Sequence, residues 1–430
     1  MQAKLKAYAL LLVLAFVPCP QAAWGGTAGA YALEPLGVQE LVRLAIRVNP
    51  AVKTARSKWY SALHRIKQNY APADPQFNFI NGDSYSNGFT QPAYRTYGIS
   101  DSFQFPGKAS LHGDIATHTA EIARLSYYAS MRDVRAETEA AYYQALLDRA
   151  LAEINADNIA SLRKVLKVTQ VAYAANQVTQ SDFISAEFDL AQAEQRQRRF
   201  LTNEMNDLTA LNQLLDRPPD SPLRLSPRLE LRPLKARVDE LVARATSARQ
   251  EILQAALSVH NSKTALRLAR MEYLPDYTLS YFFDDYYYGS AAPAPGRLQD
   301  HGEAVSVTLP LFFWMKQNED IESAHHDLAA ARDNFESVRI QTQAAVTQAY
   351  RTTQLAYETA LVYRDSLIRL ARQNFEVALV GYQSAKIDFV TLSAALANAY
   401  GARIAYLRAA NEYLAGRVAL ERAIGEPLAQ

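Results

Sequence analysis

The sequence lacks the residues and motifs that usually mark a catalytic or redox-active protein. Its 430 residues contain one cysteine, Cys19, so no disulfide can form within the chain and no CxxC motif exists. There is no HExxH, GxSxG, GxGxxG or Walker-type loop, the common signatures of metalloproteases, serine hydrolases and nucleotide-binding enzymes. We therefore predict no enzymatic activity and no cofactor, and a secreted enzyme on a helical scaffold is the weakest alternative.

An excess of charge of one sign is also missing. The formal net charge is +1, and 21% of the residues are charged. A balance this close gives no basis for nucleic-acid binding. The hydrophobic fraction of 49% argues against global disorder.

Histidine is scarce and poorly placed for metal binding. His325 and His326 are adjacent, so on a helix their side chains point about 100° apart and form no i,i+4 pair. His112 and His118 are six residues apart and share a helix face only loosely. We predict no bound metal.

Long hydrophobic runs are absent beyond the N-terminus. Residues 1–32 have the pattern of a secretory signal peptide: Lys4 and Lys6, then an apolar run at residues 7–17 that is too short to span a bilayer. Small residues at 28–32 offer cleavage sites, and a retained membrane anchor is the alternative. Cys19 is a candidate for lipidation, but Phe16-Val17-Pro18 before it is a poor match to the small residues of such sites. We expect ordinary cleavage.

What the sequence does contain is very long helical patterns. Residues 321–349 carry apolar or small side chains at alternating spacings of three and four, a heptad seam. The pattern then continues without Pro or Gly until Gly381. More than about 60 residues of helix would extend roughly 90 Å, too long for an ordinary compact domain. Residues 111–175 form a second such stretch.

The two halves of the chain repeat one order of elements. We predict a first repeat at 33–216, a proline-rich linker at 217–234 and a second repeat at 235–430. Tyr70-x-Pro72 and Tyr273-x-Pro275 are matching landmarks, as are residues 173–178 and 382–387. Each repeat has a short helix, two strands and two long helices. The strands are expected at about 76–86, 97–105, 277–288 and 304–311, and the long helices at 108–175, 182–216, 318–384 and 388–424.

The strands alternate apolar and polar residues. Tyr97, Ile99 and Phe103 fall on one side and Ser100 and Ser102 on the other, a pattern that suits a half-buried hairpin or a membrane barrel with a wet interior. Four strands cannot close a barrel, because about eight is the smallest number that does. Lipid tolerates no open sheet edge. Strands that enter a membrane would therefore require oligomerisation, and three copies would supply twelve. Asp101 lies on the apolar side, so we expect a register change or a position near the rim.

The ordered set of features resembles the TolC family of outer-membrane efflux proteins over the whole mature chain. An aromatic-Pro or Leu-Pro motif opens each long helix: Phe105-Pro106-Gly107-Lys108 and Leu309-Pro310-Leu311-Phe312. The first motif resembles the heavy-metal-efflux branch. The resemblance implies a mainly α fold with a small β part. It implies a homotrimer with a twelve-stranded β-barrel in the outer-membrane lipid and a twelve-helix α-barrel in the periplasm. It also implies a periplasmic adaptor and an inner-membrane pump as partners.

The resemblance also directs attention to the second helix turn, where the family often has acidic rings. The matching positions here are about Thr391 and Ala394, which departs from that pattern. Asp388 and Asp182 are nearby carboxylates, so Asp388, Asp182 and Thr391 are the aperture candidates. Asp182 would otherwise cap the returning helix.

Two functions remain after these steps. The first is a passive exit duct for metal ions, drugs or other small molecules delivered by a pump. The second is a soluble periplasmic coiled-coil adaptor without a pore, which would not need two amphipathic strand pairs of membrane length.

Overall fold

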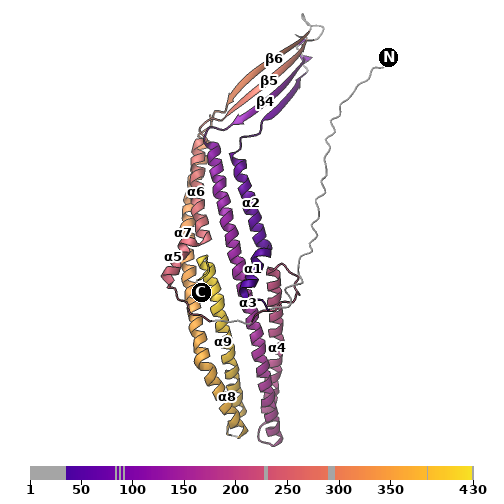
Figure 1. Ribbon diagram of the computed structural model, residues 1–430, viewed down its shortest axis with the longest axis vertical. Coiled ribbons are helices and arrows are strands. Elements are labelled where there is room, and N and C mark those ends of the chain that lie inside the picture. The colour runs from indigo at the N-terminus through magenta and orange to yellow at the C-terminus, as the bar shows by residue number, and fades with distance from the viewer. Residues whose placement is uncertain are drawn as a thin grey trace, which may run out of the picture.

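The protein is a slender molecule with a sheet at one end and helices along the rest (Figure 1). The computed structural model describes residues 35–82, 85–86, 89–90, 93–226, 231–288, 296–384 and 386–428. The expected signal peptide, with Cys19, lies outside the described residues. No helix among those described combines the length and hydropathy needed to cross a membrane.

The elements of the first half follow from clear local signals. Asn49 ends α1, and its side chain accepts a hydrogen bond from the Ala51 backbone N–H at 2.9 Å, which caps α2. Gly107, at φ 105°, precedes α3 in a left-handed conformation that glycine adopts without strain. The elements are α1 (Val38–Val48), α2 (Pro50–Tyr70), β1 (Gln76–Gly82), β2 (Tyr85–Ser86), β3 (Phe89–Thr90), β4 (Ala93–Phe103), α3 (Lys108–Ala174) and α4 (Gln180–Leu214).

Apart from the two-residue strands β2 and β3, the described elements of the second half follow the same order, with one irregularity. Its long helix contains a π-helical turn, η1, where the hydrogen-bond ladder widens by one residue. The elements are α5 (Val238–Ala248), α6 (Gln250–Met271), β5 (Tyr277–Tyr288), β6 (Gly296–Val307), α7 (Gln317–Val362), η1 (Tyr363–Leu367), α8 (Ile368–Gln383) and α9 (Phe389–Ile424). The helix predicted at 318–384 is therefore interrupted.

The helices form a wall in which short helices meet end to end beside long ones. α3 has 67 residues, so it is about 100 Å long. Asn49 Nδ2 donates to the Leu214 carbonyl at 3.1 Å and joins the start of α2 to the end of α4. Gln250 Nε2 donates to the Gly425 carbonyl at 3.3 Å and joins α6 to α9. The wall thus consists of α2, α3, α6 and α7 near the sheet, and of α4, α3, α9 and α8 at the far end (Figure 1).

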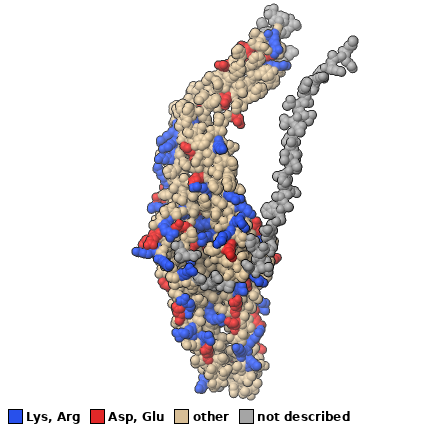
Figure 2. Space-filling view, viewed as in Figure 1, with Lys and Arg blue, Asp and Glu red and all other residues tan. Residues whose placement is uncertain are grey.

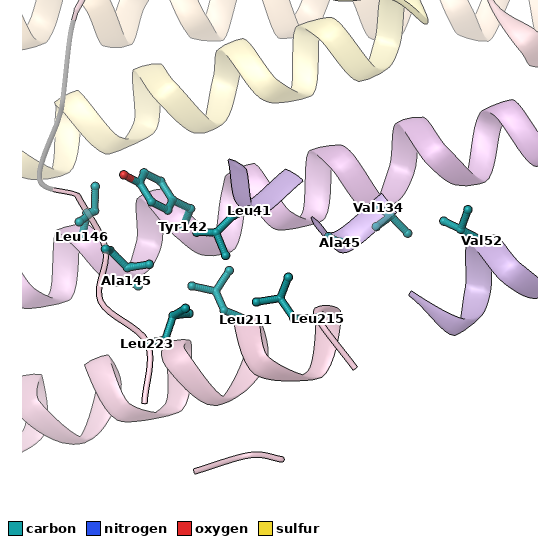
Figure 3. Packing of buried hydrophobic residues seen from close by; sticks show 11 residues of the cluster. Leu41, Ala45, Val52, Val134, Tyr142, Ala145, Leu146, Leu211, Leu215 and Leu223 are labelled. Atoms are coloured by element: carbon teal, nitrogen blue, oxygen red, sulfur yellow. The ribbon is translucent and has the colours of Figure 1, made fainter. Parts of the chain in front are cut away.

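One of the main buried clusters lies at the middle of the molecule, where these helix ends meet. Leu41 and Leu211 are 0% exposed and Tyr142 is 1% exposed. Figure 3 shows their side chains converging from α1, α4 and α3. Leu223 and Leu225, from the proline-rich segment, close the cluster. The linker therefore packs against the core that joins the helices near the sheet to the helices at the far end.

Ion pairs surround this middle level and connect the two halves. Charged side chains of both signs gather there in Figure 2. Arg132 of α3 binds Glu251 of α6 with an Nη2–Oε1 distance of 2.6 Å, and both side chains are largely shielded. Burial by itself would raise the pKa of Glu251, but the hydrogen bonds and charge of Arg132 lower it to about 2. Arg135 of α3 reaches Glu421 of α9 at 3.2 Å.

The heptad seam predicted for residues 321–349 is the packed side of α7. Leu328 is 6% exposed and packs with Leu266 of α6, whereas Thr342 is 1% exposed. Its hydroxyl donates to the Val338 carbonyl at 2.8 Å, so burial leaves no donor unpaired. The small residues of the seam let α7 lie close to its neighbours.

The four longer strands form one antiparallel sheet in the order β1-β4-β5-β6. β4 of the first half pairs with β5 of the second along its whole length, from Ala93 opposite Tyr287 to Phe103 opposite Tyr277. The sheet therefore joins the two halves directly, although its central strands are far apart in the sequence.

The predicted boundaries of three strands were wrong. The strand expected at 304–311 spans Gly296–Val307, because pairing with the twelve residues of β5 extends polar residues such as Gln299 that carry no apolar alternation. Pro310, which lacks an N–H, lies beyond its end. The strands expected at 76–86 and 97–105 span Gln76–Gly82 and Ala93–Phe103, because the β1–β4 register sets both limits.

Candidate functional site

One face of the sheet is apolar and uncovered. Its side chains come from all four strands and lie in register: Phe77 is opposite Ile99, and Ile99 is opposite Tyr281. Their exposed fractions are 70% for Phe77, 52% for Ile99, 52% for Leu279 and 69% for Val305. An apolar face of this extent is unusual on a protein surrounded by water.

The opposite face of the sheet is polar and internally hydrogen-bonded. Ser102 and Thr278 share a hydrogen bond of 3.0 Å across β4 and β5. Thr96 Oγ1 donates to Asp284 at 2.5 Å. The alternation therefore separates a wet face from an apolar one, as in barrels with a polar interior.

Both edges of the sheet are open. β1 and β6 each have one neighbouring strand in the sheet, so their outer N–H and C=O groups have no partner strand within the described chain. Such groups cannot face lipid, because each unpaired one costs several kcal/mol there. A sheet with two open edges can lie in lipid only if further strands pair with those edges.

Asp101 lies within unbroken pairing. It is opposite Leu279, and Phe103, two residues later, ends β4. The expected register change is absent, and the residue lies near the end of the sheet that adjoins the helices. At the other end of the same face, Asp285 is 2% exposed and holds Arg297 by two hydrogen bonds of 2.5 Å.

At the opposite end of the molecule, the two helical hairpins turn with the same backbone geometry. Gln177 N–H donates to the Ala172 carbonyl at 2.8 Å, and Lys386 N–H donates to the Gly381 carbonyl at 2.8 Å. Asn176 takes a left-handed φ of 54°, which asparagine tolerates better than most residues. These bonds satisfy helix-end carbonyls and fix both turns.

The first turn places Asp182 in a capping box. Thr179 is the N-cap of α4, and its backbone N–H donates to Asp182 Oδ2 at 3.0 Å. The Asp182 N–H donates back to Thr179 Oγ1 at 3.3 Å. The prediction that Asp182 itself is the cap was wrong, because α4 begins two residues earlier at Gln180.

The second turn joins the other two aperture candidates. Asp388 is the N-cap of α9, and its Oδ1 accepts the Thr391 N–H at 2.9 Å. Hydrogen bonds from the side chain and backbone of Thr391 lower the pKa of Asp388. In the single chain this carboxylate is therefore ionised at neutral pH.

The two turns flank one cleft of about 740 Å³, whose lining includes both Asp182 and Asp388. Next to the cleft the hairpins pack tightly: Leu392 is 0% exposed, and the Tyr382 hydroxyl donates to Thr169 Oγ1 at 3.2 Å. Thr391 does not line the cleft. Sequence reasoning missed Lys167 and Tyr382 in this lining, since a lysine and a tyrosine on a helix carry no local signal for it.

A buried lysine is another residue that the sequence pattern did not indicate. Lys108 begins α3 and is 2% exposed. Its Nζ lies 3.0 Å from Asp276 and 3.3 Å from Glu272, and it donates to the Leu274 carbonyl at 2.9 Å. It ties the first long helix to the turn between α6 and β5. The Phe-Pro-Gly-Lys motif thus has a structural role.

The described residues contain no group of three or more His, Cys, Asp or Glu side chains arranged to hold a metal ion. His118 and His260 are neighbours with ring centroids 6.4 Å apart.

A wall of long helices that continues into an amphipathic, open-edged sheet defines a class: channel proteins of the outer membrane. Residues 241–426 match the model of the family described as "Outer membrane efflux protein". The second half of the chain therefore matches this family, and the match supports an outer-membrane localisation. The expected TolC-type fold is confirmed, and the alternative of a soluble adaptor has no support in these matches.

Individual relatives are distant but span nearly the whole chain. The cobalt-zinc-cadmium resistance protein CzcC of Cupriavidus metallidurans is 20% identical over 91% of this chain and 90% of its own. The outer membrane protein VceC of Vibrio cholerae has a TM-score of 0.75 at 16% identity, covering 91% of this chain and 96% of its own. The CmeC outer membrane channel of Campylobacter jejuni has a TM-score of 0.76 at 14% identity, covering 90% and 85%. The family and the solved structures are channels, not enzymes.

Proposed function

We propose that three copies of this chain form the outer-membrane exit duct of a tripartite efflux system. The observation that carries this proposal is the open four-stranded sheet, apolar on one face and polar on the other, at the end of a four-helix wall. The duct is passive. Energy comes from an inner-membrane pump, and a periplasmic adaptor connects the two.

The strand directions support closure by identical copies. Because all neighbouring strands are antiparallel, β1 and β6 run in opposite directions. β6 of one copy can therefore pair antiparallel with β1 of the next. Three copies supply twelve strands, an even number that leaves no edge and encloses a wet channel. The apolar face then meets lipid.

The helices extend the same closure into the periplasm. Three copies of the four-helix wall give twelve helices around one axis, in line with the barrel. We also propose that the two repeats span residues 33–216 and 235–430, and that residues 217–234 are the linker that crosses the middle of the molecule. Residues 1–32 are proposed to be removed on export. Ordinary cleavage would remove Cys19 as well.

The far ends of the hairpins are the proposed aperture. Asp182, Asp388 and Thr391 lie on the two turns, so three copies bring like charges around one axis. We propose that the ring attracts cations and narrows the resting duct. The adaptor would bind at this end, where the cleft between the turns is open.

The cargo is proposed as metal ions, drugs or other small molecules. CzcC, which is 20% identical to this chain, is named for resistance to cobalt, zinc and cadmium, and this similarity supports metal ions as the cargo. A strain from which this gene has been deleted can be grown with and without the gene restored, in the presence of metal ions or of drugs. The challenge under which the restored gene improves growth would identify the class of cargo.

Reconstitution tests the duct itself. The full chain, purified from outer membranes in detergent, should have the mass of a trimer by native mass spectrometry. It should appear as a three-fold tube by electron microscopy and conduct ions across planar bilayers. A monomer that neither inserts nor conducts would overturn the proposal.

Asp388→Cys tests the aperture. Because the mature chain is expected to have no other cysteine, oxidation should link Asp388→Cys subunits into dimers and lower conductance, and a reductant should restore it. Val377→Cys is the matched control: Val377 is 73% exposed but lies on α8 away from the turn. Equal crosslinking of the two would remove Asp388 from the aperture.

A further inference from the structure

The turn between β6 and α7 exposes a continuous apolar patch, which we call the junction patch, residues 309–315. It comprises six large apolar side chains around Pro310. The exposed fractions are 62% for Leu309, 65% for Leu311, 67% for Phe312, 45% for Phe313, 53% for Trp314 and 70% for Met315. The corresponding turn before α3 has no such run.

The patch is continuous with the apolar face of the sheet. Val305 and Val307, the outward residues at the end of β6, are 69% and 52% exposed, and Leu309 continues their alternation. After the patch the chain becomes polar at once, with Lys316 exposed and Glu319 and Asp320 in the first turn of α7. The patch therefore marks the border between an apolar surface and a charged one.

The junction patch has a defined shape. Met315 N–H donates to the Phe312 carbonyl at 3.0 Å, and Asn318 N–H donates to the Phe313 carbonyl at 2.9 Å. The Trp314 ring lies edge-on to Phe312 and Phe313, at centroid distances of 5.9 and 5.3 Å. Because the backbone is already turned and hydrogen-bonded, the side chains project without further ordering of the chain.

We propose that the junction patch is an interfacial anchor that inserts into the periplasmic leaflet of the outer membrane, with phospholipid as its partner. This inference rests on the proposed duct, which places the apolar face in lipid. Tryptophan and other aromatic residues favour the boundary between headgroups and acyl chains, and a lysine beside them reaches the phosphates. Continuity with the outward face of β6 favours lipid over a second copy of the chain. One anchor per chain gives three around the base of the barrel.

Tryptophan fluorescence gives a direct test. The chain has three tryptophans, so the double variant Trp24→Phe, Trp59→Phe leaves Trp314 alone. The full-length variant is reconstituted into phosphatidylcholine vesicles whose chains carry bromine near the glycerol, near the middle, or not at all. We expect Trp314 emission to fall about twofold with bromine near the glycerol and less with bromine at the middle, as an interfacial position requires.

A second variant separates this inference from the duct. Trp24→Phe, Trp59→Phe, Trp314→Phe, Leu279→Trp has a single tryptophan on the outward face of β5. Native mass spectrometry checks that both variants are trimers. Quenching of both positions supports the anchor. Quenching at position 279 alone overturns the anchor, leaves the duct intact and indicates that a second copy covers Trp314. Quenching at neither position overturns the membrane barrel and the anchor with it.

Discussion

The two strand-to-helix junctions serve the same purpose with opposite chemistry. The first, before α3, buries the charge of Lys108 against Asp276 and Glu272. The second, before α7, buries no ion pair and exposes the junction patch. The partners of Lys108 belong to the second half of the same chain, so the first junction lies inside the protomer. The second lies beside the open edge of β6. The difference indicates that the first junction stabilises the single chain, whereas the second is shaped for surroundings outside it.

The largest expected effect is at the first junction. Lys108→Ala removes a cation with three acceptors, and we expect it to reduce the free energy of unfolding by about 3 kcal/mol, the low end for a broken buried pair, since both carboxylates are partly exposed. Lys316→Ala, at the exposed second junction, is the matched control and should change it little. Thermal unfolding of both variants checks this. Similar losses of stability in the two variants would contradict the difference between the two junctions.

The next-largest effect on stability is expected for the Arg132–Glu251 ion pair, which joins α3 to α6 as a second link besides Lys108. The pKa of Glu251 is lowered from 4.5 to about 2 in the folded protein. The stabilisation is therefore complete above pH 4.5 and is lost as the pH falls through about 2. Glu251→Gln should cost on the order of 2 kcal/mol at pH 7 and should flatten the acid limb of the stability profile. An unchanged acid limb in the variant would contradict this assignment.

A smaller effect of opposite sign is expected between α3 and α4. Burial, together with a hydrogen bond to Asp148 and its charge, raises the pKa of Asp207 from 3.8 to about 7. The folded state keeps a proton that the unfolded chain releases, so stability falls as the pH rises from 3.8 through about 7. Asp207→Asn should be more stable than the parent by about 1 kcal/mol at pH 8 and equal to it near pH 4. Melting temperatures at both pH values test this, and a pH-independent difference would exclude it.

The smallest expected effect on stability distinguishes the two hairpin turns. Tyr382 is 7% exposed and bonded to Thr169, whereas its counterpart Tyr173 is 41% exposed and stacks on Phe183. Tyr382→Phe should cost about 1 kcal/mol, the usual net value of one hydrogen bond, and Tyr173→Phe close to nothing. Proteolysis at the turns, followed by mass spectrometry, measures both. Equal protection in the two variants would show that the turns are equivalent in solution.

Much of the architecture was predictable because it depends on local signals. Pro106-Gly107 predicted the start of α3, and the alternation in β4 and β5 predicted their amphipathic faces. The missed features depend on distant partners. The first part of β6 is polar, and only pairing with β5 extends it. The burial of Lys108 depends on Asp276, which lies 168 residues away. Asp182 and Asp388 were chosen for their position near the turns, and only the packing of the two hairpins brings them to one cleft.

The order of amino acids by itself determined the long helices, the amphipathic strands and the repeat, because helix and strand periods are set by neighbours within a few turns. The tertiary structure decided which strand lies beside which, where short helices meet end to end, and which charges are buried. These outcomes depend on contacts between residues that are far apart in the chain, and no local pattern encodes them. The open edges of the sheet follow from that packing, and the proposed closure by three copies rests on them.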